Sequence, residues 1–526
     1  MSLDLALIAL IGPAALAAAA IAPMFGAVDP PKSMAARCLA AGMMALATAL
    51  PVAATVVSQG PIFAPLVSVV GIGLSVYVDA LSAILFVLVS FIGVVVLRYS
   101  RNYLDGDPRQ SHFFNWLALT LASVLTLIVS GNVALLIAAW IATSLGLHKL
   151  LLFYPGRPAA QLAAKKKFVA SRIGDLCLIC AAWMLWSRLG SLELPNLIAS
   201  ARGLSAADHS LSAPALLIAC AALLKSAQLP VHGWLIEVME TPTPVSALLH
   251  AGVINARGFL VLRLADVVVS SGAAMKTLAL VGGATALFGS VVMLTQTSVK
   301  VSLAYSTIAQ MGFMMLECGL GAFPAALLHI VAHSLYKAHA FLSSGSIIDL
   351  ARASWTPSPS GQPHPARYLL AIVATPLFAL VVGAFFGATL IEKPGAIVLA
   401  AILLMGLAHL FANAWDERFN PYVLGKAAGM AVIVAVSFFA LHAGMEVLLA
   451  HSVPQSAPLR GPIDAILAIV VILSFGAVTL FQSVMASHAK SDFWQAAYVH
   501  LSQGLYLNTL ANRLMLRLWP RRAIAN

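Results

Sequence analysis

Residues 225–250 read KSAQLPVHGWLIEVMETPTPVSALLH, and this stretch decides how the chain folds. It joins two apolar spans, predicted at about 212–230 and 243–264, and Pro230 and Gly233 interrupt the helix shortly after Lys225. Broken helices at membrane depth are tolerated where they line a cavity or are buried in protein, and they recur at ion sites of transporters. We therefore predict that Lys225, beside such a break, is the titrating centre of a buried site.

The composition extends this prediction to the whole chain. Of its 526 residues 61% are hydrophobic and only 9% are charged, with a mean hydropathy of +0.94, which excludes a water-soluble domain. Uniform hydrophobicity without strand alternation indicates helices and not a barrel. The sequence predicts an all-α integral membrane protein with about fifteen transmembrane helices, at roughly 3–22, 34–57, 74–97, 113–130, 132–153, 168–187, 212–230, 243–264, 273–295, 301–321, 323–346, 367–390, 395–413, 425–449 and 464–486.

Basic residues predict the orientation, because cytoplasmic loops carry an excess of lysine and arginine. With the N-terminus outside, 19 basic residues fall in inside loops and the tail, against six outside: Arg188, Arg202, Arg263, Lys276, Lys393 and Arg460. We therefore expect a multi-pass protein of a bacterial inner membrane, surrounded by lipid, with a cytoplasmic C-terminus. The net charge of +11 then reflects topology, and no nucleic-acid partner is expected.

Basic residues within the spans are candidate functional groups. Five lie there: Lys149, Arg172, Lys225, Arg257 and Lys337. Each costs about 2.5 to 3.5 kcal/mol or more at the bilayer centre, so a functional role is the default interpretation. The alternative is that a side chain reaches the surface or forms a structural ion pair. For Lys149, near a helix end, we weight the functional and the structural interpretation equally.

The densest group of such residues is the run from His329 to Lys337. His329, His333 and Lys337 are spaced by four, which places them on one helix face. Since histidine titrates near neutral pH, this face suits a proton relay. Two histidines four apart also suit zinc, and structural hydrogen bonding is a third interpretation. We prefer the relay, because no acidic residue lies between the histidines and no third metal ligand is evident.

Several motifs together carry a family resemblance. They are the 225–250 run, Val78-Asp79-Ala80-Leu81-Ser82, Arg172-Ile-Gly-Asp175, Lys300-Val-Ser-Leu-Ala-Tyr-Ser306 and His329 to Lys337, spread over about residues 77–346. The chain resembles the proton-pumping, antiporter-like subunits of respiratory complex I and of multisubunit sodium/proton antiporters. This implies two inverted five-helix repeats with broken helices. The expected organisation is N-terminal helices at 1–112, repeats at 113–264 and 273–413, C-terminal helices at 425–486, and a basic amphipathic tail at 487–526.

The same resemblance implies roles for individual residues. Lys225 becomes the central lysine, and His250 is its neighbour in the relay. His329, His333 and Lys337 link the two half-channels, while Arg172 and Asp175 form a charge pair that modulates Lys225. Asp79 and Lys300, within their motifs, are further candidates for the path.

The chain also departs from this family. Trp140 is followed by Ile141 where the family has glutamate, so the usual acid partner of Lys225 is absent unless Asp175 or another acid compensates. His148, two helical turns along the same face, and Lys149 beside it are candidate substitutes. No clear lysine lies on the twelfth helix or its successor, where the family has its exit group, and His409 is the nearest candidate.

A narrower resemblance accommodates these departures. The runs 232–240 and 250–255 and the tail 498–520 are similar to the membrane subunit of the two-component DAB inorganic-carbon accumulation complex. This implies a soluble, zinc-containing partner related to β-carbonic anhydrases on the cytoplasmic face. Flow of protons or Na⁺ through this chain would drive hydration of carbon dioxide to bicarbonate in that partner. The chain itself is then a transporter subunit without enzymatic activity, metal or cofactor.

Two alternatives remain open. One is a cation/proton antiporter or ion-pumping redox-complex subunit with no role in carbon uptake. The other is a non-conducting anchor for a partner, which the missing glutamate permits. Buried charge argues against the anchor, because an anchor gains little from membrane-embedded lysine and histidine.

Overall fold

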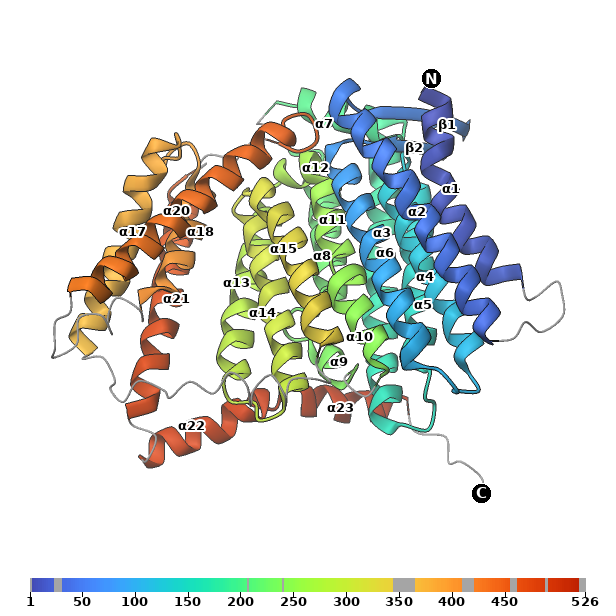
Figure 1. Cartoon of the computed structure of the whole chain (residues 1–526). Helices are drawn as coiled ribbons and strands as arrows, with labels where there is room; N and C mark the ends of the chain where they lie inside the picture. Colours follow the sequence, from blue (N-terminus) through green and yellow to red (C-terminus); the bar gives the residue numbers. More distant parts are fainter. Residues whose placement is uncertain are drawn as a thin grey trace.

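The computed structural model describes residues 2–22, 31–205, 208–238, 241–343, 365–408, 421–454, 461–487 and 491–519. These residues form a bundle of long helices that run between two opposite faces (Figure 1). We call the upper face in Figure 1, where the chain starts, the N-terminal face. The lower one, which carries the last described helices, is the C-terminal face.

The N-terminal part holds three long helices and one hairpin. Its elements are α1 (Ser2–Ile21), α2 (Pro31–Gln59), β1 (Ile62–Val69), β2 (Ile72–Val78) and α3 (Ala80–Tyr103). The strands pair antiparallel, with Ile62 opposite Val78. The turn between them uses Gly71 at φ +74°, a conformation that glycine adopts without steric cost.

The middle part contains two helical breaks in one connected segment. Its elements are α4 (Gln110–Val129), α5 (Val133–Leu151), α6 (Pro158–Leu189), α7 (Leu194–Gly203), α8 (Ser212–Lys225), α9 (Gly233–Glu237), α10 (Thr243–Leu248), the π-helical turn η3 (Leu249–Val253), α11 (Ala256–Arg263) and α12 (Ala265–Val269). The chain is irregular between α8 and α9. From α10 to α11 it passes through the wider turn η3.

The last part forms the left side and the base of the bundle in Figure 1. Its elements are α13 (Gly272–Met293), α14 (Val299–Gly319), α15 (Phe323–Leu342), α17 (Pro365–Phe385), α18 (Pro394–Met405), α20 (Pro421–Leu448), α21 (Pro462–Ser487), α22 (Asp492–Ser502), the 3₁₀ turn η4 (Gly504–Tyr506) and α23 (Leu507–Leu518). Helices α22 and α23 lie across the C-terminal face, below the other helices.

The helices meet the requirements of a membrane-spanning bundle. Among the described residues, eleven helices are long and apolar enough to cross a membrane, while α8 and α18 are shorter apolar helices. Large apolar side chains point outward, for example Leu176 (61% exposed), Trp183 (65%) and Ile433 (63%). Such an outer surface suits hydrocarbon and not water. The multi-pass helical prediction is confirmed, while the number fifteen stays a prediction.

Small residues bring α13 and α14 close together. A Cβ added at Gly282 would lie 2.6 Å from the Gly312 carbonyl oxygen, and one at Gly319 would lie 2.7 Å from the Ala279 Cα atom. Close backbone approach through small residues is typical of helix packing in membranes. This contact fixes α14, which carries several side chains of the site.

Two predicted boundaries are wrong. The span predicted at 74–97 starts within β2, and its helix begins only at Ala80, where the Asp79 carboxylate accepts the Ser82 backbone N–H as an N-cap. The span predicted to start at 168 begins ten residues earlier, because Pro158 opens α6 at a position where its missing N–H costs nothing. The three lysines at 165–167 therefore lie inside a helix.

Candidate functional site

Lys225 is the last residue of α8 and lies directly at the helix break. Beyond it the backbone leaves helical geometry, with Ala227 at φ +53°, and helix resumes only at Gly233 in α9. Pro230 within this stretch has no N–H to continue a helical ladder. The Lys225 side chain is 2% exposed, so its ammonium group is held inside the bundle.

Asp175 is the acidic partner of Lys225. The two side chains form an ion pair between α6 and α8, and Arg172 Nη2 lies 2.7 Å from the other Asp175 carboxylate oxygen. The Lys225 Nζ atom also lies 4.4 Å from the centre of the Trp140 ring. Two cations thus share one carboxylate beside an aromatic face. Within the described residues Asp175 thus pairs with Lys225, while position 141 carries isoleucine.

A second polar network connects the helix break to the C-terminal tail. Lys166 Nζ lies 2.7 Å from Glu237 Oε2, and it also donates to Asn508 Oδ1 (2.7 Å) and Asn512 Oδ1 (2.6 Å). Both asparagine amides in turn donate to Glu237 Oε1, at 3.0 and 2.8 Å. A Cβ at Gly233 would collide with the Asn508 side chain, so glycine is required for this close approach. The tail helix α23 is therefore fastened beneath the break.

Lys167, the next residue on α6, is a further buried cation. It is 2% exposed and its ammonium group donates to the Ser144 backbone oxygen on α5. His148, one turn beyond Ser144, is half-buried. Lys149 is exposed and lies over the Trp116 ring, 5.7 Å from its centre. The structure thus places Lys149 on the outer surface and not with Lys225.

His250 lies in the π-helical turn η3, between the two halves of the bundle. The residue is 0% exposed, and its Nδ1 atom lies 2.9 Å from the Thr307 hydroxyl on α14. Its ring stacks on Phe341 with centroids 4.3 Å apart. The segment just after this turn is tied to α15, because Asn255, the N-cap residue of α11, donates through Nδ2 to the Ser334 hydroxyl at 2.6 Å. These contacts hold the imidazole against both α14 and α15.

The predicted row on α15 is buried at Lys337 and His333, partly buried at His329, and ends at an acid. Lys337 is 0% exposed and donates to the Ser306 hydroxyl at 2.9 Å. One turn up, the His333 ring lies 6.0 Å from the His329 ring. His329 Nδ1 lies 3.0 Å from Glu317 Oε2 on α14. Within the described residues, neither ring nitrogen of His333 has a hydrogen-bond partner.

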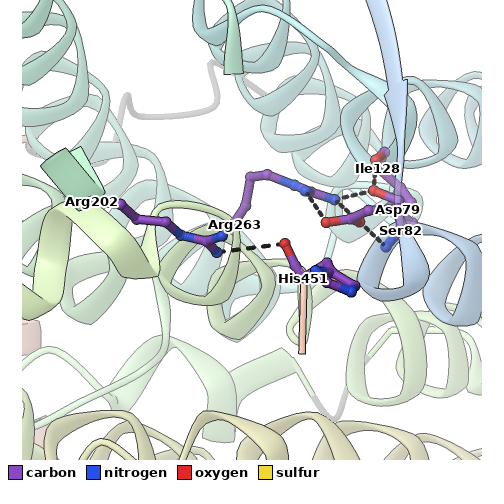
Figure 2. A network of polar contacts seen from close by, with 6 residues as sticks. All are labelled: Asp79, Ser82, Ile128, Arg202, Arg263 and His451. Carbon is purple, nitrogen blue, oxygen red and sulfur yellow. Dashed lines mark hydrogen bonds and ion pairs between the residues drawn. The ribbon is translucent and has the colours of Figure 1, made fainter. Parts of the chain in front are cut away.

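Asp79 lies apart from this row, in a buried ion pair near the N-terminal face. Arg263 donates to both of its carboxylate oxygens at 2.9 Å and also to the Ser82 hydroxyl, as Figure 2 shows. Both charged side chains are 0% exposed. Arg202 approaches from the other side and donates to the His451 backbone oxygen. Arg263, expected in an outside loop, is thus a core residue that joins α11 to α3.

Two further candidates do not join the site. Lys300 is exposed in the first turn of α14. His409 lies outside the described residues. Within the described part of the chain, no group of three or more histidine, cysteine or acidic side chains is arranged to hold a metal ion.

The sequence interpretation does not find four members of the site. Lys167 was assigned to a loop, although Pro158 gives a signal for an earlier helix start. Glu317 lies on a neighbouring helix with no spacing to connect it to His329. Asn508 and Asn512 lie four residues apart in the tail, which indicates one helix face but not its partner.

Titratable side chains therefore follow each other through the bundle interior. They extend from Lys166 and Lys167 to the Lys225 and Asp175 pair, and from His250 to Lys337, His333 and His329. Buried groups of this kind mark ion pathways and proton relays in membranes. No hydrogen bond or ion pair between described residues joins Lys225 directly to His250.

Two family models match the chain. Residues 130–356 match the membrane family described as NADH:quinone oxidoreductase/Mrp antiporter. Residues 65–114 match the N-terminus of chain 5 of NADH-ubiquinone oxidoreductase, complex I. The first match contains every membrane-embedded residue of the row from Lys225 to Lys337.

Curated relatives match over most of the chain. A probable inorganic carbon transporter subunit DabB2 of Halothiobacillus neapolitanus is 41% identical over 86% of this chain and 82% of its own length. A probable subunit DabB of Hydrogenovibrio crunogenus is 37% identical over 85% and 83%. A chloroplastic NAD(P)H-quinone oxidoreductase subunit 5 of Zygnema circumcarinatum is 39% identical, but over only 52% of this chain and 39% of its own.

Solved structures share the fold. The Mrp complex from Dietzia sp. DQ12-45-1b aligns over 99% of this chain and 61% of the matched chain, with a TM-score of 0.62 and 22% identity. The membrane-bound sulfane sulfur reductase, an archaeal respiratory complex, aligns over 97% and 99%, with a TM-score of 0.58 and 17% identity. The antiporter-like fold expected from the sequence is confirmed.

Proposed function

Because the chain belongs to the DabB family of probable inorganic carbon transporter subunits, we propose that it couples cation flow to hydration of carbon dioxide in a partner protein. The chain is a multi-pass membrane transport subunit with an antiporter-like fold. The cation is a proton or Na⁺. It moves along the buried row from Lys225 through His250 to Lys337, His333 and His329.

One observation carries the conduction proposal. Lys225 and Asp175 form a buried ion pair at a helix break, and the α15 row continues from Lys337 to the His329 and Glu317 pair. Lysine and histidine at membrane depth are costly, and a scaffold gains nothing from a row of them. A proton carried by such a row changes the charge beside Asp175, and that change is what a coupled partner has to sense.

The partner belongs on the C-terminal face, which we assign to the cytoplasm. The excess of basic residues in the predicted inside loops supports this orientation. The partner we propose is a soluble zinc protein related to β-carbonic anhydrases, and the zinc and the hydration chemistry belong to it. On this face α23 contacts Lys166 and Glu237 directly below the Lys225 break. The tail is thus the element of this chain nearest to both the partner and the site.

Rescue of a carbonic-anhydrase-deficient bacterium in ambient air tests the proposal. The full chain is expressed with its genomic neighbour, as wild type, Lys225→Ala and Lys32→Ala. Lys32 is an exposed lysine at the start of α2 and serves as the matched control. We expect growth with wild type and with Lys32→Ala, no growth with Lys225→Ala at equal membrane abundance, and loss of growth on adding an uncoupler.

The same strains distinguish the second candidate, a cation/proton antiporter with no role in carbon uptake. The family model that matches residues 130–356 and the Mrp-like fold favour this alternative. If the wild type does not rescue growth while vesicles show cation/proton exchange, the antiporter function replaces carbon accumulation. If Lys225→Ala rescues as well as wild type, conduction through Lys225 is wrong.

A further inference from the structure

The row on α15 does not end at His329. Glu317 Oε2 lies 3.0 Å from His329 Nδ1. Glu317 is 4% exposed and lies in the last turn of α14, at the N-terminal face. A buried carboxylate at the end of a row of lysine and histidine is a proton acceptor that needs a further neighbour if the path is to reach water.

His442 on α20 is a buried imidazole without a hydrogen-bond partner. It is 3% exposed, and within the described residues neither of its ring nitrogens is hydrogen-bonded. An unpaired buried polar group costs free energy, commonly about 1–3 kcal/mol, and so requires an explanation. The ring packs edge-on against Phe438, with centroids 6.0 Å apart, which gives it apolar contact but no polar partner.

One apolar cluster joins His442 to the end of the α15 row. The Phe313 ring lies 5.8 Å from the His329 ring, and Phe313 and Phe438 both pack against the cluster of Ala322, Ala325 and Leu399. Helix α20 packs directly on α15. The two helices therefore place His442 in the same neighbourhood as the His329 and Glu317 pair.

Beyond His442 an ion pair leads to solvent. Glu446 follows His442 by four residues, on the same face of α20. Its carboxylate lies 2.6 Å from Lys393 Nζ, and the two side chains are 11% and 28% exposed. Lys393 is the N-cap residue of α18, at the N-terminal face. Exposure thus increases from His442 through Glu446 to Lys393.

We propose that Glu317, His442, Glu446 and Lys393 form the outer limb of the cation path, which carries protons between His329 and the N-terminal face. This inference rests on the proposed conduction through Lys225. A proton passes between the His329 imidazole and the Glu317 carboxylate, then to a His442 ring nitrogen, and reaches water at the Glu446 and Lys393 pair. The groups that exchange the proton with water then lie on α20 and at the start of α18, and not on the twelfth helix.

The alternative is that these side chains only fasten α20 to α14, α15 and α18. A structural ion pair explains Lys393 and Glu446, and a hydrogen bond explains Glu317. A purely structural role does not explain the unpaired, buried His442 imidazole. Phenylalanine or leucine would fill the same space at a lower cost in free energy. The unpaired ring nitrogens of His442 are therefore the observation that favours transfer over fastening.

Proton flux through the full chain in proteoliposomes containing a pH-sensitive dye tests the limb. The variants are His442→Asn and Glu317→Gln, which keep hydrogen-bonding groups but do not titrate near neutral pH, with Lys225→Ala as the blocked reference. His451→Asn, an exposed histidine at the same face, is the matched control. We expect each of the two limb variants to lower flux by about tenfold or more, with an unchanged thermal midpoint, while His451→Asn conducts like wild type.

The outcomes separate the limb from the conduction it rests on. If Lys225→Ala is blocked while His442→Asn and Glu317→Gln conduct like wild type, the limb is wrong and conduction stands. If wild type and Lys225→Ala show the same flux, conduction itself is wrong. Two variants on different helices keep the test decisive when one of them does not accumulate in the membrane.

Discussion

Lys225 and Lys337 are both buried lysines in the same row, but their surroundings differ. Lys225 pairs with the Asp175 carboxylate, which also lies 2.7 Å from Arg172. Lys337 donates to a serine hydroxyl and a backbone carbonyl, at 2.9 and 3.3 Å. Within the described residues no acidic side chain pairs with it. One lysine is neutralised by a fixed charge, and the other is solvated by neutral dipoles.

This difference assigns different tasks to the two halves of the row, one around Lys225 and the other around Lys337. A charge that is compensated in place is stabilised by its partner, and removing that partner leaves an unpaired buried ion. A buried ammonium group held only by dipoles has no such anchor, so its proton is the charge that can leave. We therefore expect the Lys225 half of the row to bind its proton more tightly and the Lys337 half to pass its proton on more readily.

Asp175→Asn should have the largest effect, because it leaves Lys225 and Arg172 without their shared carboxylate. Breaking one partner of a buried pair costs about 3–5 kcal/mol. We expect the free energy of unfolding in detergent to fall by that order and proton flux in proteoliposomes to be lost. Asp105→Asn, at an exposed aspartate, is the control. Unchanged stability in Asp175→Asn would show that the pair does not neutralise Lys225.

Lys337→Met should separate stability from conduction. Replacing a buried charge by an apolar side chain of similar volume is often neutral or stabilising by about 1–4 kcal/mol. Since no described acid is left unpaired, we expect equal or higher stability together with loss of flux. The free energy of unfolding in detergent and proton flux in proteoliposomes check this prediction. A destabilisation as large as that of Asp175→Asn would reveal a charge partner and remove the contrast between the two lysines.

The parts of this contrast that lie on one helix could be predicted from the sequence. The break after Lys225 follows from Pro230 and Gly233, and the α15 row follows from spacings of four. Arg172 and Asp175 lie three apart on α6, which places them on one face. The membrane fold follows from composition and is confirmed, as is the family resemblance.

The parts that depend on packing could not be predicted. Asp79 and Arg263 are 184 residues apart, and no local pattern connects them. Glu317 and Lys167 become members of the site only because α14 packs beside α15 and α5 packs beside α6. The hairpin from Ile62 to Val78 was missed because its apolar alternation merges with the following helix. Each miss reflects tertiary contact, which single-sequence periodicity does not contain.

Thr307→Val should have an intermediate effect, because it acts on the residue between the two halves. It removes the hydroxyl at 2.9 Å from His250 Nδ1 and leaves a buried ring nitrogen unpaired. That costs about 1–3 kcal/mol, while the imidazole itself is retained. We expect reduced but measurable flux, with Thr277→Val on the exposed face of α13 as the control. Complete loss of flux would mean that the hydroxyl itself carries the proton.

Removing the two tail asparagines should have the smallest effect on proton flux, and its effect on stability should be confined to the half of the row around Lys225. Asn508→Ala with Asn512→Ala deletes the hydrogen bonds to Lys166 and Glu237 but leaves that ion pair, at about 1 kcal/mol for each lost bond. Asn102→Ala, exposed near the same face, is the control.

Double-mutant cycles show which of the two buried lysine sites is coupled to the lost hydrogen bonds of Asn508 and Asn512. Because α23 contacts α6 and α9, the tail variant should couple to Asp175→Asn and add independently to Lys337→Met. Equal coupling to both would mean that the tail supports the bundle as a whole. Coupling to Asp175 alone would place the tail on the half around Lys225, where a partner on the C-terminal face reaches the site through Asn508 and Asn512.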